Sequence, residues 1–300
     1  MKEWIRDLFE FPRKINDLNS ALDYINNIIP LMIHKWKEGE KCWTWIIPDG
    51  GIEVGEHIIK GTTDETIILP IHLDHPKMAN DNLSGVAVAI ELTNWIKNPR
   101  YTYKFLFLPE TIGTIAYLSR FGTDYKYGIV IDSVGGDGDL VTTLPKTPSL
   151  LLFYVSGKVN DFFSDAHLWS GNDERVLESV NIPSIQISRS PFLEYHSEKD
   201  TPDRIDEKQL EDALGYVDDI IIKIERDFIP QPQYRGIPCL SANGLWEKEY
   251  ESPHTFMKIE RIWHSFGYGL SVSQIANWHN LPFHFVYNFV KEMKSKGLVS

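Results

Sequence analysis

Two histidines and two aspartates lie within ten consecutive positions of the 300-residue chain: His72, Asp74, His75 and Asp81. Imidazole nitrogens and carboxylate oxygens are the ligands that zinc takes in sites that keep one coordination position open for water. A second explanation is equally simple, because Asp81 precedes a predicted helix and its side chain could cap the first turn. For this cluster alone, a metal site and ordinary loop and capping roles are equally favoured.

Three further polar residues follow apolar stretches later in the chain. Glu110 and Asp132 each end a predicted buried strand, and His196 lies in a polar loop before a predicted helix. A single acid at a strand end is more often solvated or capping than a ligand. In a parallel α/β sheet, however, functional side chains collect where the carboxyl ends of the strands meet. These three residues and the first cluster would then converge, as a metal site requires.

The elements expected to position these residues alternate between strand and helix. Short apolar runs bounded by turn residues predict buried strands, and apolar residues at helical spacing predict the connecting helices. We therefore expect an α/β fold with a doubly wound, mostly parallel sheet. The predicted strands cover residues 43–47, 57–60, 66–72, 103–108, 127–132 and 149–155, and the predicted helices cover residues 4–36, 82–95 and 115–121.

The last part of the chain differs in composition from the part before it. Three prolines fall between residues 230 and 238, which is typical of a linker. We predict a first domain at residues 1–228, a linker at residues 229–251, and a small helical, winged-helix-like domain at residues 252–300. This last domain has five basic and two acidic side chains, although the whole chain carries a net charge of −12. The charge asymmetry supports separate domains.

The predicted C-terminal domain has the spacing of a helix-turn-helix. Its last helix would expose Lys291, Lys294 and Lys296, which suit contacts with phosphate groups. The start of that helix carries Phe283 and Phe285 instead of side chains that read bases. We therefore expect residues 252–300 to dock against protein in preference to binding nucleic acid.

Composition and charge exclude several classes of protein. The chain has 42% hydrophobic and 24% charged residues, as soluble globular proteins do, and no apolar run approaches the roughly 18 residues of a membrane span. Its start resembles no secretion signal, and Cys42 and Cys239 form no disulfide framework. We expect a cytoplasmic protein that binds no membrane. The negative net charge argues against a protein that coats nucleic acid.

The polar motifs follow one another in a characteristic order. A histidine comes first, and it is followed by Asn80-Asp81-Asn82-Leu83-Ser84-Gly85, Pro109-Glu110-Thr111-Ile112-Gly113, Ile131-Asp132-Ser133 and Tyr195-His196-Ser197. This order resembles the zinc aminopeptidase superfamily. The chain is more closely similar to a bacterial aminopeptidase-like family known as polysaccharide-biosynthesis proteins with an aminopeptidase-like domain. That closer similarity rests on His75-Pro76 before the Asn-Asp-Asn-Leu-Ser-Gly stretch and on the box Gly171-Asn172-Asp173-Glu174-Arg175.

The resemblance covers about residues 40–225, and it implies a metal site. His75, Asp81 and Asp132 would bind one zinc ion. Asp81 would bridge to a second ion, which His196 and a glutamate would complete. The family's C-terminal winged-helix module is also suggested by residues 270–300.

The resemblance further implies that a water activated by the metal attacks the scissile carbonyl while a glutamate moves the proton. The superfamily has two adjacent glutamates for these tasks, whereas this chain has only Glu110 in that motif. Glu110 is then either the base or a ligand. If it is a ligand, Glu194 and Glu174 are the candidates for the base.

Two histidines compete for the first ligand position. His72-Leu73-Asp74 matches the form found across the superfamily, and His75-Pro76 matches the closer family. Because strand side chains alternate in direction, we do not expect both histidines to reach one metal, and we favour His75. Asp74 would then orient a ligand or be an ordinary loop acid.

Two arginines and a tyrosine are candidates for contacts with the substrate. The guanidinium groups of Arg175 and Arg189 match a carboxylate or phosphate, although buried ion pairs with Asp173 or Glu174 are equally favoured. Tyr195 could donate a hydrogen bond to a developing oxyanion or could simply pack beside the ligand loop.

The sequence and the resemblance together predict a zinc-dependent hydrolase of aminopeptidase type with one or two zinc ions per chain. Its substrate would be a small peptide or an amino-acid or amino-sugar conjugate, cleaved at an amide next to a free amine. The first alternative is a deacylase acting on a sugar-linked amide. The second is a non-enzymatic metal or ligand sensor with the winged-helix-like domain as its output. The oligomeric state is left open.

Overall fold

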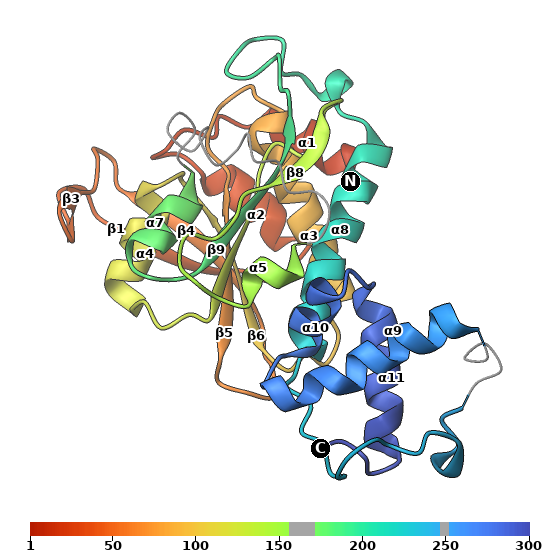
Figure 1. The fold of residues 1–300 in the computed structure, drawn as a ribbon. Coiled ribbons are helices and arrows are strands. Elements are labelled where there is room, and N and C mark those ends of the chain that lie inside the picture. The colour runs from red at the N-terminus through yellow and green to blue at the C-terminus, as the bar shows by residue number, and fades with distance from the viewer. Residues whose placement is uncertain (156–171, 247–251) are drawn as a thin grey trace. The chain divides into compact units, whose positions relative to one another are not determined.

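The computed structural model describes residues 1–155, 172–246 and 252–300. A seven-stranded sheet in the order β1-β4-β6-β5-β7-β9-β8 forms the centre of its larger part (Figure 1). β5 pairs in parallel with β6 and β7, and β7 pairs in parallel with β9, whereas β4 and β8 run antiparallel to their neighbours. The strands are β1 (Met32–Trp36), β4 (Ile52–Ile59), β5 (Thr66–His72), β6 (Thr102–Leu108), β7 (Tyr127–Ile131), β8 (Asp139–Thr142) and β9 (Ser184–Ser190), with β2 (Lys41–Cys42) and β3 (Trp45–Ile46) in a separate pair.

Helices join the parallel strands and cover the sheet. The chain crosses from β5 to β6 through α3 (Gly85–Trp95) and from β6 to β7 through α4 (Ile112–Phe121). The central strands are buried on both faces, and Tyr103, Phe105 and Phe107 of β6 have no exposed surface. Such continuous burial is typical of parallel strands between two layers of helix. Among the described residues, the remaining helices of this part are α1 (Lys2–Phe9), α2 (Asn19–Asn26), η1 (Asn80–Ser84), α5 (Leu151–Tyr154), α7 (Asp173–Ser179), η2 (Pro202–Arg204) and the start of α8 (Glu207–Arg226).

The predicted α/β class with a mostly parallel sheet is confirmed, but two predicted elements are wrong. Residues 149–155, predicted as a strand, contain the short helix α5, in which Leu151 and Tyr154 are buried while Leu152 is exposed. A short apolar run fits a buried helical turn as well as a strand. The predicted helical segment at residues 4–36 ends in strand β1, because pairing with β4 overrides the local apolar spacing.

The described chain forms two compact units, Met1–Asp219 and Ile220–Ser300. The second unit contains η3 (Ser241–Asn243), α9 (Pro253–His264), η5 (Ser265–Tyr268), α10 (Val272–Trp278) and α11 (Phe283–Ser295). Its helices pack around an apolar core of their own, and Ser271 and Gln274 form a capping box at the start of α10. The helical character predicted for the C-terminal region is therefore present. A winged helix and the boundaries at residues 228 and 251 stay predictions. In the described part of the chain, no helix has the length and apolar character needed to span a membrane.

Candidate metal centre

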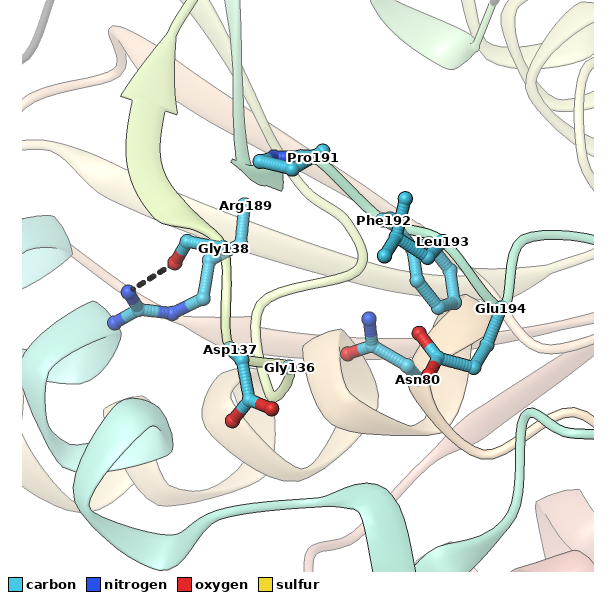
Figure 2. A pocket seen from close by; sticks show the side chains of 9 residues that line it. All are labelled: Asn80, Gly136, Asp137, Gly138, Arg189, Pro191, Phe192, Leu193 and Glu194. Carbon is cyan, nitrogen blue, oxygen red and sulfur yellow. Dashed lines mark hydrogen bonds between the residues drawn. The ribbon is translucent and has the colours of Figure 1, made fainter.

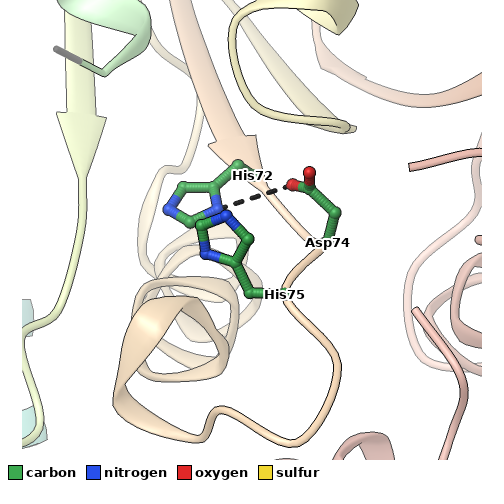
Figure 3. A group of neighbouring side chains, drawn as sticks. All are labelled: His72, Asp74 and His75. Atoms are coloured by element: carbon green, nitrogen blue, oxygen red, sulfur yellow. Dashed lines mark ion pairs between the residues drawn. The ribbon is translucent and has the colours of Figure 1, made fainter. Parts of the chain in front are cut away.

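The polar residues singled out in the sequence meet at the carboxyl edge of the parallel strands. His72 is the last residue of β5, and His75 lies on the loop that follows it (Figure 3). Asp132 comes directly after β7, Glu110 is the second residue after β6, and His196 lies in the loop after β9. The topology therefore places side chains from four neighbouring strands at one end of the sheet, as a parallel α/β fold permits.

Asp81, in η1, lies at the middle of this cluster. Its Oδ1 atom is 3.3 Å from His72 Nε2 and 3.2 Å from His75 Nδ1, and its Oδ2 atom is 3.1 Å from His196 Nε2. His72 Nε2 is also 3.4 Å from Asp132 Oδ1. Asp81 is thus shared by two groups: a buried triad of His72, Asp81 and Asp132, and an open triad of His75, Asp81 and His196. In each triad, one ligand atom from every residue lies within 4.8 Å of the others.

The atoms of the cluster fit a metal ion better than they fit one another. His72 Nδ1, His75 Nδ1 and Asp81 Oδ2 are buried and have no hydrogen-bond partner among the described residues. His75 Nδ1 lies close to Asp81 Oδ1, and Asp81 Oδ2 lies close to His196 Nε2, but neither contact has the geometry of a hydrogen bond. Buried polar groups are normally paired, and these atoms are of the types that bind zinc.

Opposite charges stabilise one another in the cluster. Burial by itself would lower the pKa of His72, but the Asp132 and Asp74 carboxylates raise that pKa well above its ordinary value. Burial acts against ionisation of Asp81 as well, yet the close contact with His75 and the charge of His72 hold the pKa of Asp81 below its ordinary value. The histidines therefore occupy a place where the surrounding carboxylates favour positive charge, as they would favour a bound cation.

Glu110 stands at the edge of the open triad. Its Oε2 atom lies 3.5 Å from His75 Nε2. Burial raises the pKa of Glu110 to about 7, and the Asp173 carboxylate adds to the rise, although the charge of His72 opposes it. A carboxyl group with such a pKa can both take and return a proton near neutral pH.

The side chains of the buried triad are held by further hydrogen bonds. Asp132 Oδ2 accepts from Asn172 Nδ2 at 2.8 Å and from Gln186 Nε2 at 3.0 Å, while its Oδ1 accepts from Ser133 Oγ at 3.0 Å. Asp74 Oδ1 accepts from the backbone N–H of Glu110 at 2.9 Å and lies 3.6 Å from His72 Nδ1. Asp74 therefore fixes the positions of neighbouring candidate groups.

Two charged residues that the sequence did not reveal hold the backbone of the ligand loops. Arg13 is fully buried and donates hydrogen bonds to the carbonyl oxygens of Leu73, Asp74 and Met78. The Asp200 carboxylate accepts from the backbone N–H groups of Asn80 and Asp81, at 2.7 and 3.0 Å. Arg13 lies about 60 positions before the loop it holds, in a stretch with no motif around it, so sequence spacing carries no signal for this contact.

The candidate substrate contacts are found in three different places. Arg175 is exposed and lines a surface hollow with Lys146 and Glu178, and the residues that line this hollow include none of the metal cluster. Tyr195 is about half exposed and stacks on His196, with ring centroids 3.9 Å apart.

Of the five-residue box that supports the family resemblance, Gly171 lies outside the described residues.

The substrate role expected for Arg189 does not agree with its surroundings. Its guanidinium is buried and donates to the carbonyl oxygens of Val134, Gly138 and Gln209 and to the Asp212 carboxylate. The expected ion pair with Asp173 or Glu174 is also replaced by the one with Asp212 at 2.8 Å. Arg189 thus ties together backbone segments of the fold.

Comparison with known proteins identifies relatives of the chain. Residues 2–227 match the family described as a domain of unknown function, DUF4910. A Clostridium acetobutylicum protein, provisionally named a polysaccharide biosynthesis protein with an aminopeptidase-like domain, is 32% identical over 230 residues. The match covers 66% of this chain and 51% of the relative, so the chain spans about half the length of that curated protein.

Solved structures share the fold at low sequence identity. A crystal structure from Clostridium acetobutylicum, provisionally named a peptidase, has a TM-score of 0.83 at 20% identity and covers 100% of this chain and 95% of its own. Glutaminyl cyclase from an Acidobacteriales bacterium has a TM-score of 0.56 at 17% identity, with 75% and 93% covered. A leucine aminopeptidase precursor from Bacteroides thetaiotaomicron has a TM-score of 0.53 at 16% identity, with 73% and 94% covered. The resemblance seen in the sequence is confirmed: the chain belongs to the DUF4910 family and has an aminopeptidase-like α/β fold.

Proposed function

We propose that the chain is a metal-dependent hydrolase of aminopeptidase type that cleaves an amide bond next to a free amine. The observation that carries this proposal is the pair of triads that share Asp81 at the carboxyl edge of the sheet. The aminopeptidase-like fold supports it, as do the names of the relatives. The substrate would be a small peptide or an amino-acid or amino-sugar conjugate.

The residues of the two triads would hold one or two zinc ions. His72 and Asp132 would bind on the buried side of Asp81, and His75 and His196 on its open side. This arrangement modifies the ligand set that the resemblance implies, because His72 takes the place beside Asp132 that was expected for His75. When bound, zinc supplies a Lewis acid for the amide carbonyl and promotes ionisation of water.

Glu110 would move the proton. Its carboxyl group lies beside His75 at the rim of the open triad, and its pKa of about 7 suits a group that first takes a proton from water and then gives it to the leaving amine. Glu174 is almost fully buried, and burial raises its pKa to about 8, so it is poorly placed to exchange protons with a substrate. We therefore assign the base to Glu110 and not to Glu174.

One experiment tests the metal and the base together. Elemental analysis should find zinc in the wild-type protein and in Glu110→Gln. The rate at which Glu110→Gln hydrolyses aminoacyl anilides should be lower by about 10²-fold or more. Glu211→Gln, at an exposed position of α8, is the matched control and should retain both properties. Loss of zinc from Glu110→Gln would make Glu110 a ligand, and full activity in that variant would refute its role as base.

The name of the Clostridium relative favours one alternative substrate, because a polysaccharide biosynthesis protein would act on sugars. A panel that contains aminoacyl anilides and N-acetylated amino sugars separates an aminopeptidase from a sugar-amide deacylase. A sensor would bind metal, hydrolyse neither class, and use residues 252–300 as its output. The cytoplasmic location and the preference of that region for protein over nucleic acid stay predictions.

A further inference from the structure

A hollow of about 160 Å³ is lined by the β7–β8 loop, the end of β9 with the residues after it, and the residue before Asp81 (Figure 2). Asn80 lines it and is joined in sequence to Asp81. Glu194 also lines it and lies two positions before His196. A cavity of this size accepts a group about as large as a benzene ring. No residue of the two triads lines the hollow, but two of its lining residues lie within two positions of ligand residues in the sequence, so it is a candidate for receiving the part of a substrate next to the bond at the metal centre.

The Asn80 side chain offers the hollow a hydrogen-bond donor. Asn80 is 98% buried, since its exposed fraction is 2%. Its Oδ1 atom accepts from the backbone N–H of Gly135 at 2.7 Å, which fixes the orientation of the amide. Its Nδ2 atom is buried without a hydrogen-bond partner among the described residues. A buried donor left unpaired costs stability, so this one is explained if a ligand supplies its acceptor.

The other walls define what the ligand must carry. Glu194 contributes a carboxylate whose nearest cation among the described residues, Arg204 Nε, is 4.0 Å away, so it can accept a hydrogen bond from a ligand. Arg189 lines the hollow but turns its guanidinium to the Gly138 carbonyl and other protein groups (Figure 2). The Phe192 ring gives an apolar wall. A carboxylate ligand would be repelled by Glu194 and by the exposed Asp137, which also lines the hollow, and a simple ammonium group has no acceptor to offer Asn80.

We propose that this hollow is a specificity pocket for a neutral group that carries both a hydrogen-bond acceptor, for Asn80 Nδ2, and a donor, for Glu194. A primary carboxamide and the neighbouring hydroxyl groups of a sugar both have this chemistry. The inference rests on the proposed function, because it names the substrate class of the same site.

Gly136 supplies a variant that fills the hollow. A Cβ atom at this position would lie 3.2 Å from Asn80 Nδ2, and the backbone there does not require glycine. Gly136→Ala should therefore crowd the donor without removing any bond of the fold. Gly215→Ala is the matched control, because a Cβ at Gly215 meets nothing within 4 Å. Glu194→Gln keeps the size of the side chain and removes its charge, so it provides a second variant in an exposed loop.

The test measures binding by calorimetry to the zinc-loaded protein, with L-glutaminamide, glucosamine and L-leucinamide as probes. The two amino-acid amides share the α-carboxamide and differ only in the side chain that would enter the hollow. We expect glutaminamide or glucosamine to bind at least about tenfold more tightly than leucinamide, and the preferred probe identifies the source of the polar group. Gly136→Ala and Glu194→Gln should each reduce this preference about tenfold, with unfolding temperatures near that of the wild type. Equal binding of all three probes, or a preference unchanged in both variants, would overturn the inference.

Hydrolysis of the glutamine and leucine anilides separates this inference from the proposed function. Cleavage of both at the same efficiency, with no effect of Gly136→Ala, would sustain the hydrolase and refute the pocket. Selective binding of the polar probes without hydrolysis of any amide would sustain the pocket and refute the hydrolase.

Discussion

The two triads that share Asp81 differ in how the protein surrounds them. In the buried triad, the side chains of His72 and Asp132 are 1% and 12% exposed. In the open triad, those of His75 and His196 are 22% and 48% exposed. Side-chain hydrogen bonds fix Asp132, whereas His196 is supported by stacking on a half-exposed tyrosine. The residues of the buried triad are therefore preorganised by the core, whereas the histidines of the open triad are accessible to solvent.

This difference assigns different tasks to the two halves. A rigid, buried set of ligands holds a metal firmly because little is lost in ordering it. An accessible set exchanges its ion more easily and can admit a substrate. We therefore expect two zinc sites of unequal affinity, with the tighter ion at the buried triad and the substrate approaching from the open triad beside Glu110.

The largest loss of zinc and of hydrolytic activity is expected from a substitution of Asp81, the residue common to both triads. Asp81→Asn neutralises the carboxylate that both sites share and replaces one of its oxygens by an NH2 group, so the protein should lose both zinc ions and about 10³-fold or more of its hydrolytic activity. Elemental analysis and anilide hydrolysis measure the two losses. Asp64→Asn, at an exposed position with a surface ion pair, should change neither. One full equivalent of zinc in Asp81→Asn would show that the triads are independent.

The second effect concerns the loop that carries His75. Arg13→Met leaves the carbonyl oxygens of Leu73, Asp74 and Met78 without their charged donor, and breaking such a buried set typically costs about 3–5 kcal/mol. The free energy of unfolding should fall by about that amount in urea titrations. Zinc binding at the open triad should weaken more than binding at the buried triad.

Arg6→Met, at an exposed position of α1, is the control for the loss of a positive charge and should stay within about 0.5 kcal/mol of the wild type. If Arg13→Met were as stable as this control, the loop would not depend on the arginine.

The third effect separates the two triads directly. His196→Ala removes an exposed ligand of the open triad only, so the variant should retain one tightly bound zinc per chain and lose the second. A chelator titration should show two phases in the wild-type protein and one phase in the variant. His264→Ala, an exposed histidine of the second unit, should keep both phases. Retention of two ions by His196→Ala would remove His196 from the ligand set.

The carboxyl edge of the sheet could be predicted because its residues follow strong local patterns. The apolar runs before His72, Glu110 and Asp132 end where the strands end, and parallel strands bring those ends together. We expected that His72 and His75 would not both reach one metal, and the structure places the two imidazoles in separate triads that share Asp81. β5 ends at His72, and His75 has a φ of 76°, so the alternation of strand side chains no longer applies to it.

The groups that support the ligands were beyond prediction because their contacts depend on the assembled fold. Asp200 binds backbone N–H groups about 120 positions earlier in the chain, and Arg13 binds carbonyl oxygens that are about 60 positions later. Arg189 illustrates the opposite error. Its residue type suggested an anion, but the fold surrounds it with carbonyl oxygens. Residue type gives the chemistry that a side chain can perform, and burial determines where that chemistry is used.

The smallest expected effect is a change in the pH dependence of stability on the side of the buried triad. Burial raises the pKa of Glu174 to about 8 from an ordinary value of 4.5, and the Asp173 and Asp132 carboxylates contribute. At pH values between 4.5 and 8, Glu174 keeps its proton in the folded protein but has released it in the unfolded chain. The free energy of unfolding should therefore fall as pH rises toward 8, and Glu174→Gln should remove that part of the decline.

Urea unfolding at pH 6.5 and 8.5, with chelator present to remove metal effects, measures the free energy of unfolding at each pH. The part of its decline that is due to Glu174 should be about 1–2 kcal/mol. Asp173, whose pKa burial raises to about 6, has largely lost its proton across this range, so it adds little to the difference. The raised pKa of His72 contributes a decline of the same sign, but that decline is common to both proteins and cancels in the comparison. Identical slopes for the wild type and Glu174→Gln would mean that Glu174 is already ionised in the fold. The buried triad would then lie beside a permanent negative charge, which would strengthen its hold on a cation and widen the difference between the two triads.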